Sequence, residues 1–279
     1  MKKILFALVF LGLVFALSFS HQGSVGSAAF STYQAHELRL IDSIGRYNQL
    51  LDWDGQLLSG SGNRVVALSV ETPNNPTITG RSAPLSGVVQ DMVRAGNMLY
   101  VVADSGILHI LNMDDPLRPV EVGSYQFWNT DHYGVAVAAE RAYVLINDGL
   151  LILDISNPAI PKPLGTYSEF GLGSPFKVRA ESTFVYLQKE WNTAITVLDF
   201  VDPGSPVELA TYSAVQEVAD YAVGNGYLYV AAEQEGLRVL DISDPGNLLE
   251  TAVIEHPADA ITLYLDRAYV TENSGTRVY

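Results

Sequence analysis

Short apolar runs separated by polar residues make up most of this chain. The runs are five to seven residues long, rich in Val, Ile, Leu and Tyr, and bounded by Gly, Asn, Asp or Pro. This pattern is typical of β-strands. One stretch predicts four consecutive strands, at Val135–Ala139, Ala142–Ile146, Leu150–Ile155 and Lys162–Tyr167. Because no stretch beyond residue 20 has a convincing helical period, the pattern predicts an all-β protein.

The strand pattern repeats along the chain. The segment LLILDISNP at 150–158 aligns with LRVLDISDP at 237–245, and three further copies end in the same way. The prolines that end the copies are Pro73, Pro116, Pro158, Pro203 and Pro245, with spacings of 43, 42, 45 and 42 residues. Proline lacks a backbone donor, so we expect it in the connection after the third strand. Four-stranded units at this period predict a β-propeller, with blades around a central channel.

Two more columns of residues follow the period. The first contains tyrosines in the second strand of each unit: Tyr100, Tyr143, Tyr186, Tyr229 and Tyr269. The second lies four residues before the prolines and contains Asn112, Asp154, Asp199 and Asp241. We expect the tyrosines to pack between blades, and the polar column to hydrogen-bond the turn that follows it.

The LLILDISNP and LRVLDISDP segments, with the Gly165-Thr166-Tyr167 ending downstream, resemble the LVIVD repeat. The resemblance covers roughly Leu85 to the C-terminus, and more loosely everything from Leu38. Residues 269–275 also resemble the related YVTN propeller repeat. The resemblance implies an exported or cell-surface propeller of bacteria or archaea. It implies no catalytic residues, because the family's activity is not established.

The two chain ends predict how the ring closes. Ile41–Tyr47 matches the fourth-strand ending of the repeats but has no first three strands before it. Residues 260–265, 267–271 and 276–279 look like strands one to three without a fourth. Joining the two fragments would close the last blade, leave no open sheet edge and give six blades. The alternative is a longer protein, interrupted at Tyr279, with seven or more blades.

The first twenty residues have the layout of a secretory signal peptide. A basic start, Lys2-Lys3, precedes an apolar run from Ile4 to Leu17 and small residues before His21. The run is short for a membrane span of about 20 residues, which favours cleavage over an anchor. We therefore predict a signal peptide at 1–20, a linker at 21–37 and the propeller at 38–279. The predicted location is secreted, periplasmic or cell surface, with no membrane span after cleavage.

Charge and cysteine content narrow the function. The net charge is −15, and loss of residues 1–20 removes two lysines and no acid, leaving 14 basic against 31 acidic residues, or −17. Such a surface repels nucleic acid and anionic headgroups. The chain has no cysteine, so packing alone must hold the exported protein together.

Familiar catalytic and metal-binding motifs are missing from the sequence. The five histidines are scattered without metal-ligand spacing, and no GxSxG segment occurs. Asp52-Trp53-Asp54-Gly55 faintly resembles the start of a calcium loop, but it fits better as a turn between first and second strands. The sequence therefore predicts no cofactor.

Three acidic residues are candidates for a binding site at the channel. Asp91, Asp220 and Asp259 are expected where the innermost strands begin, around the channel mouth. Gly134 and Lys177 occupy the equivalent positions of two other blades. The three carboxylates are candidates to hold Ca²⁺ or another cation, or the basic patch of a partner. The alternative is that turns in an acidic chain simply favour aspartate.

Aromatic residues in the loops of adjacent blades are the second candidate site. Loops on one face of a rigid ring are free to carry binding residues, and exposed aromatic side chains suit a protein or glycan contact. The alternative is that these side chains cap the blades as core. The candidates are Phe127, Trp128, His132, Tyr133 and Trp191, with Phe170 and Phe176 nearby.

Three functional hypotheses follow. The first is an exported, non-enzymatic propeller that binds an extracellular protein or polysaccharide through its loop-rich face. The second is a hydrolase or lyase that uses channel-mouth groups: Asp91, His132, Lys177 and Asp220. The third is a structural module of a larger surface protein.

Overall fold

The computed structural model describes most of the chain from residue 47 onward. The described residues are 5–10, 13–18, 39–40, 47–54, 56–69, 77–127, 134–147, 149–168, 175–189, 193–214, 217–264, 267–272 and 275–279. Every regular element in them is a β-strand. The all-β prediction is therefore confirmed, and none of these residues belongs to a helix suited to crossing a membrane.

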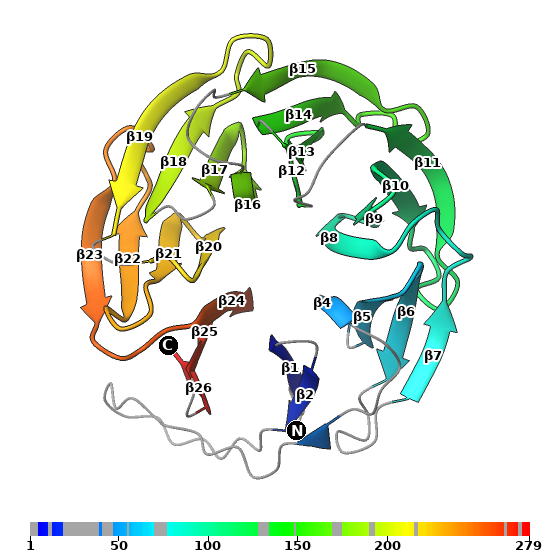
Figure 1. Ribbon diagram of the computed structural model, residues 1–279, viewed down its shortest axis with the longest axis horizontal. Helices are drawn as coiled ribbons and strands as arrows, with labels where there is room; N and C mark the ends of the chain where they lie inside the picture. The colour runs from blue at the N-terminus through cyan, green and yellow to red at the C-terminus, as the bar shows by residue number, and fades with distance from the viewer. Residues whose placement is uncertain are drawn as a thin grey trace.

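Five four-stranded antiparallel sheets stand around a common axis as the blades of a propeller (Figure 1). Blade 1 contains β4 (Tyr47–Trp53), β5 (Gln56–Ser61), β6 (Arg64–Ser69) and β7 (Thr77–Arg81). Blade 2 contains β8 (Val89–Ala95), β9 (Met98–Ala103), β10 (Ile107–Asn112) and β11 (Val120–Gln126). Blade 3 contains β12 (Val135–Ala138), β13 (Arg141–Ile146), β14 (Gly149–Asp154) and β15 (Lys162–Ser168). Blade 4 contains β16 (Pro175–Glu181), β17 (Phe184–Lys189), β18 (Ala194–Asp199) and β19 (Val207–Ser213). Blade 5 contains β20 (Asp220–Gly224), β21 (Tyr227–Ala231), β22 (Leu237–Asp241) and β23 (Leu249–Ile254).

Two three-stranded sheets occupy the rest of the ring. One contains β24 (Ala260–Tyr264), β25 (Arg267–Glu272) and β26 (Gly275–Val278). The other contains β1 (Leu5–Phe10), β2 (Leu13–Ser18) and β3 (Arg39–Leu40), and it lies between β24–β26 and blade 1 in Figure 1.

The blade count corrects the prediction from the sequence. The structure has five four-stranded blades, rather than six or the alternative of seven or more. The expected shared blade does not form among the described strands, because Tyr47 begins β4 of blade 1 and β26 pairs with β25 alone. Residues 41–46 lie outside the described residues. The signal peptide concerns processing of the segment that contains β1 and β2, and it stays a prediction.

The strand positions within a blade agree with the sequence pattern. In blade 3 the four observed strands match the four predicted ones to within about one residue at each end. The turn at Asp54, between β4 and β5, has a positive φ of 51°, which confirms a turn at this place.

The hydrophobic core lies between blades rather than inside them. Each of the five clusters of buried apolar side chains draws residues from two neighbouring sheets. Four of the five column tyrosines belong to these clusters, and Tyr269 is buried in the β24–β26 sheet. Tyr143 is fully buried and packs against Phe200 of the next blade, with 5.2 Å between ring centroids. The prediction of inter-blade packing is confirmed for these four tyrosines. Side-to-side stacking of faces that cannot be buried alone is what repeat architectures require.

The polar column holds the turn after the third strand. Asp154 accepts a hydrogen bond from the Ser156 N–H at 2.9 Å, and Asp199 and Asp241 do the same two residues downstream. Asn112 accepts from the Asp114 N–H at 2.7 Å in the same way. The predicted structural role of this column is confirmed.

The outer strands touch the turns of the next blade. A Cβ on Gly123 of β11 would lie 2.0 Å from the Pro158 carbonyl oxygen of blade 3. The equivalent Gly165 of β15 would meet the Pro203 carbonyl oxygen at 3.0 Å. These contacts explain why glycine precedes the Ser-Tyr and Thr-Tyr endings of blades 2 and 3.

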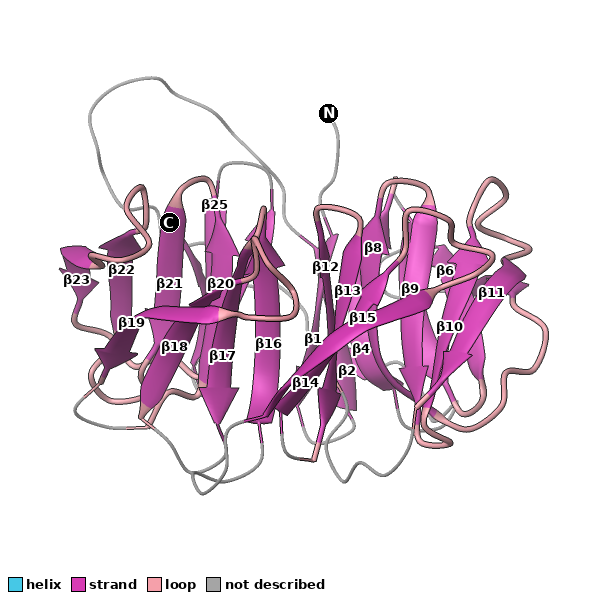
Figure 2. Ribbon diagram, turned by 90° about the horizontal axis from the view of Figure 1, so that it is seen from above, coloured by secondary structure: helices cyan, strands magenta, loops and turns pink. Residues whose placement is uncertain are grey.

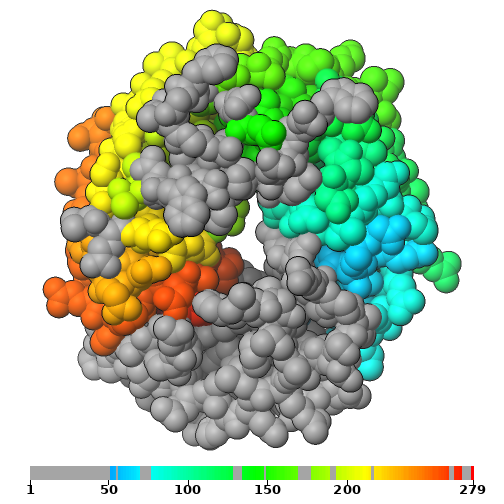
Figure 3. Space-filling model, in the orientation of Figure 1, coloured from blue at the N-terminus to red at the C-terminus, as the bar shows by residue number. Residues whose placement is uncertain are grey.

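The innermost strands line an open axis. The strands run between two faces of the disc (Figure 2), and the space-filling view is open along the axis of the ring (Figure 3). The connections between blades and the second-to-third hairpins meet on one face. For example, the Val88 N–H donates to Asp104 at 2.7 Å, and the Ser105 hydroxyl donates to the Ser86 carbonyl. We call the end of the axis on this face the channel mouth.

Candidate functional site at the channel mouth

One position near the start of each innermost strand lies at the channel mouth, and we call it the slot. It pairs with the residue two after the column tyrosine, as Asp91 pairs with Val102. By the same register the slot residues of blades 2 to 5 and of the β24–β26 sheet are Asp91, Gly134, Lys177, Asp220 and Ala260.

The register separates Asp259 from the two other acidic candidates. Ala260, not Asp259, pairs with Thr271 and so occupies the slot of its sheet. Asp259 lies one residue earlier, where its N–H donates to the Thr271 carbonyl at 2.8 Å. The sequence grouped three aspartates by their distance from the tyrosine column, but only Asp91 and Asp220 are equivalent.

Asp91 joins blade 2 to blade 3. Its Oδ1 accepts the N–H of Met92 at 2.9 Å, and its Oδ2 accepts the N–H of Val135 in β12 at 2.8 Å. Burial raises the pKa of the Asp91 carboxyl, while Arg179, the two N–H bonds and Lys177 oppose that rise. A carboxylate that bridges two backbones in this way acts as a latch between innermost strands.

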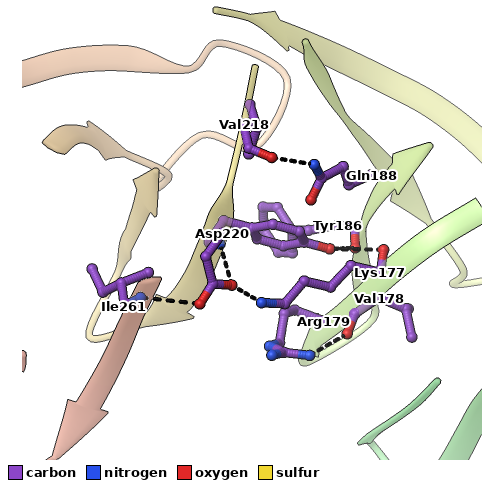
Figure 4. Close-up of polar contacts among 9 residues, drawn as sticks. Lys177, Val178, Arg179, Tyr186, Gln188, Val218, Asp220 and Ile261 are labelled. Atoms are coloured by element: carbon purple, nitrogen blue, oxygen red, sulfur yellow. Dashed lines mark hydrogen bonds and ion pairs between the residues drawn. The ribbon is translucent and has the colours of Figure 1, made fainter. Parts of the chain in front are cut away.

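Asp220 makes the same latch between blade 5 and the β24–β26 sheet (Figure 4). Its Oδ1 accepts the Tyr221 N–H at 2.7 Å, and its Oδ2 accepts the Ile261 N–H at 3.0 Å. Asp220 also forms an ion pair with Lys177, the slot residue of blade 4. Because the side chains of Lys177 and Asp220 are only 19% and 15% exposed, this pair is partly shielded from water.

Lys177 and Arg179 bring positive charge to the channel from β16. Burial lowers the pKa of Lys177 well below its ordinary 10.5, Arg179 lowers it further and Asp91 opposes the shift. Asp220, in direct contact, acts in the same direction as Asp91, because a neighbouring carboxylate favours the ammonium form. Arg179 donates to the Val178 carbonyl at 2.9 Å (Figure 4).

Tyr221 secures blade 5 against blade 4 beneath these charges. Its hydroxyl lies within hydrogen-bond distance of two carbonyl oxygens, those of Lys177 at 3.0 Å and Tyr186 at 2.7 Å. The Lys177 ammonium lies 5.4 Å from the centroid of the Tyr221 ring, within the range of a cation–π contact. Burial raises the pKa of the Tyr221 hydroxyl, so the tyrosine stays a neutral donor.

Blade 3 has no side chain in its slot. An ideal Cβ on Gly134 would meet the Leu145 Cδ1 at 2.6 Å and the Asp91 Oδ2 at 3.6 Å. The junction between blades 3 and 4 therefore lacks the latch that Asp91 provides at the junction before it.

The predicted cation site does not match the way the two carboxylates are used. Each of Asp91 and Asp220 already accepts two backbone N–H groups, which are donors and not a setting for a metal ligand. Among the described residues no group of three or more His, Cys, Asp or Glu side chains is placed to hold a metal ion. The calcium proposal from the sequence stays a prediction.

The aromatic candidates divide into two groups. Phe127 is only 4% exposed and packs in the core cluster between blades 2 and 3, which favours the core alternative for this residue. Trp128, His132, Tyr133, Phe170 and Trp191 lie outside the described residues. Phe176 lies in β16.

Sequence reasoning missed Arg179. The signal is in the column two residues after the slot, where Arg179 stands among Val93, Ala136 and Ala222 of the other blades. A long cation in a column of small or apolar residues is a departure from the repeat that the alignment alone could have found.

Comparisons with known proteins support the fold and the repeat. The family model of the LVIVD repeat matches residues 86–127, 132–169 and 217–253, in blades 2, 3 and 5. No curated protein matches the chain in sequence.

Several solved structures share the propeller fold. The WD40 β-propeller domain of Doa1 is 13% identical with a TM-score of 0.69, covering 96% of this chain and 85% of that one. A chain of the mitotic checkpoint complex is 15% identical with a TM-score of 0.68, covering 99% and 85%. A Bacteroides uniformis protein proposed to be a 6-phosphogluconolactonase is 13% identical with a TM-score of 0.68, covering 95% and 87%.

At these identities the likeness to solved structures shows the fold alone. The repeat matches are in register with three of the observed blades. The chain therefore contains LVIVD repeats at these three places and has the β-propeller fold.

Proposed function

We propose that this chain is an exported, non-enzymatic binding module that engages a protein or polysaccharide through the face at the channel mouth. In the described residues that face carries the connections at 82–88, 217–219 and 255–259, together with second-to-third hairpins such as the one at 104–106. By the repeat we expect the connections after blades 2 and 3 to reach the same face. Connections on a rigid ring are free to vary without loss of the fold, so binding residues gather there.

The use of the repeated polar and aromatic residues is the observation that carries this proposal. The tyrosine column packs between blades, the aspartate column holds turns, and the slot carboxylates latch strands together. These residues are occupied in holding the ring. What distinguishes one blade from another is the sequence of the connections, and we assign recognition to them.

The same observation weighs against the hydrolase or lyase hypothesis. A general base needs an oxygen or nitrogen that can reach the substrate proton. Both oxygens of Asp91 and of Asp220 accept backbone N–H groups, and Lys177 is paired with Asp220. His132, the fourth member of that hypothesis, lies outside the described residues.

The fold neighbours fit a binding role. The WD40 propeller of Doa1 and the propeller chain of the mitotic checkpoint complex are both similar to this chain in structure. The second is a component of a protein assembly. By that likeness we propose that this chain also binds another macromolecule.

The test is a binding screen of the full chain, immobilised, against purified bacterial polysaccharides and cell-surface proteins. Trp128→Ala and Trp191→Ala change the proposed face. Val201→Ala is the matched control, because Val201 is 67% exposed in a turn after the third strand. We expect the two tryptophan changes to abolish a captured interaction with the thermal midpoint almost unchanged, and the control to bind normally.

Two results would count against the binding role. Equal binding by all variants would remove the face from consideration. Depolymerisation of a polysaccharide by a small molar amount of protein would favour the hydrolase or lyase hypothesis instead.

A further inference from the structure

We propose that the channel mouth binds a carboxylate group of a ligand between blades 3 and 4, at the slot where Gly134 stands. There the ligand would take the place that an aspartate carboxylate takes at two other junctions. This inference rests on the proposed binding function and names the chemistry of one contact on that face.

The first argument is a backbone donor that faces the channel. Val178 pairs with Leu187 in the same register as Val135 pairs with Val144. The Val135 N–H points to the channel edge, because it donates to Asp91 of the preceding blade. The N–H of Val178 therefore points to the same edge of β16.

The chain's own slot residues offer this donor no acceptor. In blades 2, 3 and 5 the equivalent N–H donates to the aspartate of its own slot, as Met92 does, or to that of the preceding blade, as Val135 does. For Val178 these two positions are Lys177 and Gly134, and neither has a side-chain oxygen. A buried N–H without an acceptor is costly, and Val178 is only 1% exposed, so in the described part of this junction the edge favours an oxygen supplied by a ligand.

The second argument is a guanidinium beside that donor. Arg179 donates to the Val178 carbonyl, which lies on the same strand edge as the Val178 N–H. This bond holds the guanidinium at the channel edge (Figure 4). An arginine has five N–H donors in a planar fork, and this geometry suits a carboxylate better than a single acceptor. A carboxylate at the slot would accept from Val178 with one oxygen and from Arg179 with the other.

The third argument is the missing side chain at Gly134. An ideal Cβ there would lie 2.6 Å from the Leu145 Cδ1, the far end of a flexible side chain, so a group that enters the slot must displace this tip. This restriction favours a small carboxylate at the end of a ligand over a bulky group.

The charged side chains around the slot determine which ligand charge it attracts. Lys177 forms an ion pair with Asp220, so Arg179, whose guanidinium carbon lies 6.0 Å from the Tyr221 ring centroid, supplies the positive charge for a ligand. Asp91 lies on the other side, with both oxygens already accepting N–H groups and its pKa raised by burial. The attraction is local, because the chain as a whole carries a charge of −15.

The test follows the Val178 amide in ¹H–¹⁵N spectra of the full chain during titration with sodium acetate. Glucuronate tests whether a sugar acid also fits, and glucose is the neutral control. We expect acetate to move the Val178 signal in a saturable way and glucose to leave it in place. Binding of glucuronate as well as acetate would assign the site to acidic sugars, and binding of acetate alone to small carboxylates. No saturable shift with either acid, or an equal shift with glucose, would overturn the proposal.

Two variants separate the site from its surroundings. Gly134→Asp supplies the carboxylate from the chain, so we expect it to abolish acetate binding, whereas Gly134→Ala adds the same Cβ without an acceptor and should still bind. Arg179→Gln removes the cation and should weaken acetate affinity about tenfold. If Gly134→Asp does not fold, the Arg179→Gln result decides, because unchanged affinity in that variant contradicts the proposal. Failure of acetate binding while macromolecular capture persists would remove this site and leave the proposed function standing.

Discussion

Two neighbouring junctions of the ring differ at one position of the innermost strand. Between blades 2 and 3, the Asp91 carboxylate bridges the two backbones at the channel mouth. Between blades 3 and 4, Gly134 occupies the same register position and offers no side chain to bridge the two innermost strands. Both junctions are filled by buried apolar clusters of similar make-up. The difference teaches that packing forms the ring, while the slot residue determines what closes each junction at the axis.

The largest expected effect tests whether packing alone can hold the junction without a latch. Tyr143→Ala removes the ring that packs against Phe200 and leaves a cavity between blades 3 and 4. We expect a loss of about 3–5 kcal/mol of unfolding free energy, measured by urea denaturation. A loss below about 1 kcal/mol would mean that other contacts hold this junction.

The latch comes next. Asp91→Ala leaves the N–H groups of Met92 and Val135 without their acceptor, so we expect a loss of about 2–4 kcal/mol at neutral pH. Asp259→Ala is the matched control, because Asp259 is outside the slot, and it should change stability by no more than about 0.5 kcal/mol. Equal effects of the two changes would refute the distinction between these aspartates.

The outer rim offers a paired comparison of the same two junctions. Gly123→Ala would place a Cβ 2.0 Å from the Pro158 carbonyl oxygen, so the turn of blade 3 must move. Gly165→Ala meets the Pro203 carbonyl oxygen at 3.0 Å, which a small shift relieves. We expect a loss of about 1–3 kcal/mol for the first change and less for the second, by thermal and urea unfolding. The reverse order would show that the outer contacts are not the constraint on these glycines.

The smallest effect is the pH dependence of the latch. Burial raises the pKa of Asp91 above its ordinary 3.8, so the folded state holds this proton more tightly than the unfolded state does. The stability that comes from this shift is complete below pH 3.8 and is lost as the pH rises through the raised pKa. The stability of the wild type relative to Asp91→Asn, which does not titrate, should therefore decrease with rising pH. A constant difference across that range would show that Asp91 titrates normally.

Much of the blade architecture could be predicted because the same strand pattern occurs several times along the chain. Pro158 and Pro245 mark the same turn, Tyr143 marks the same packing position as its equivalents, and the blade 3 strands fall where the pattern put them. The blade count could not be predicted, because it depends on which sheet edge a terminal segment joins. Tyr47 looked like the end of a fourth strand, yet it begins β4, the first strand of blade 1.

The site shows the limits of sequence reasoning more sharply. Spacing placed Asp91 and Asp220 at the channel mouth, but it could not show that their oxygens accept the N–H groups of neighbouring strands. That use depends on the distance between innermost strands, which is a property of the closed ring. Counting along the chain also could not distinguish Asp259 from Ala260, because one residue of register moves a side chain to the other face of a strand.

Each buried apolar cluster takes its members from two adjoining sheets, so no blade possesses an interior of its own. A single repeat produced on its own would therefore expose two apolar faces, and it would precipitate or associate with copies of itself. Gain or loss of a repeat during evolution brings together two flanks that were never selected to match. We therefore expect repeats to be gained or lost as complete blades whose flanks already match. Related proteins should then differ in length by whole blades.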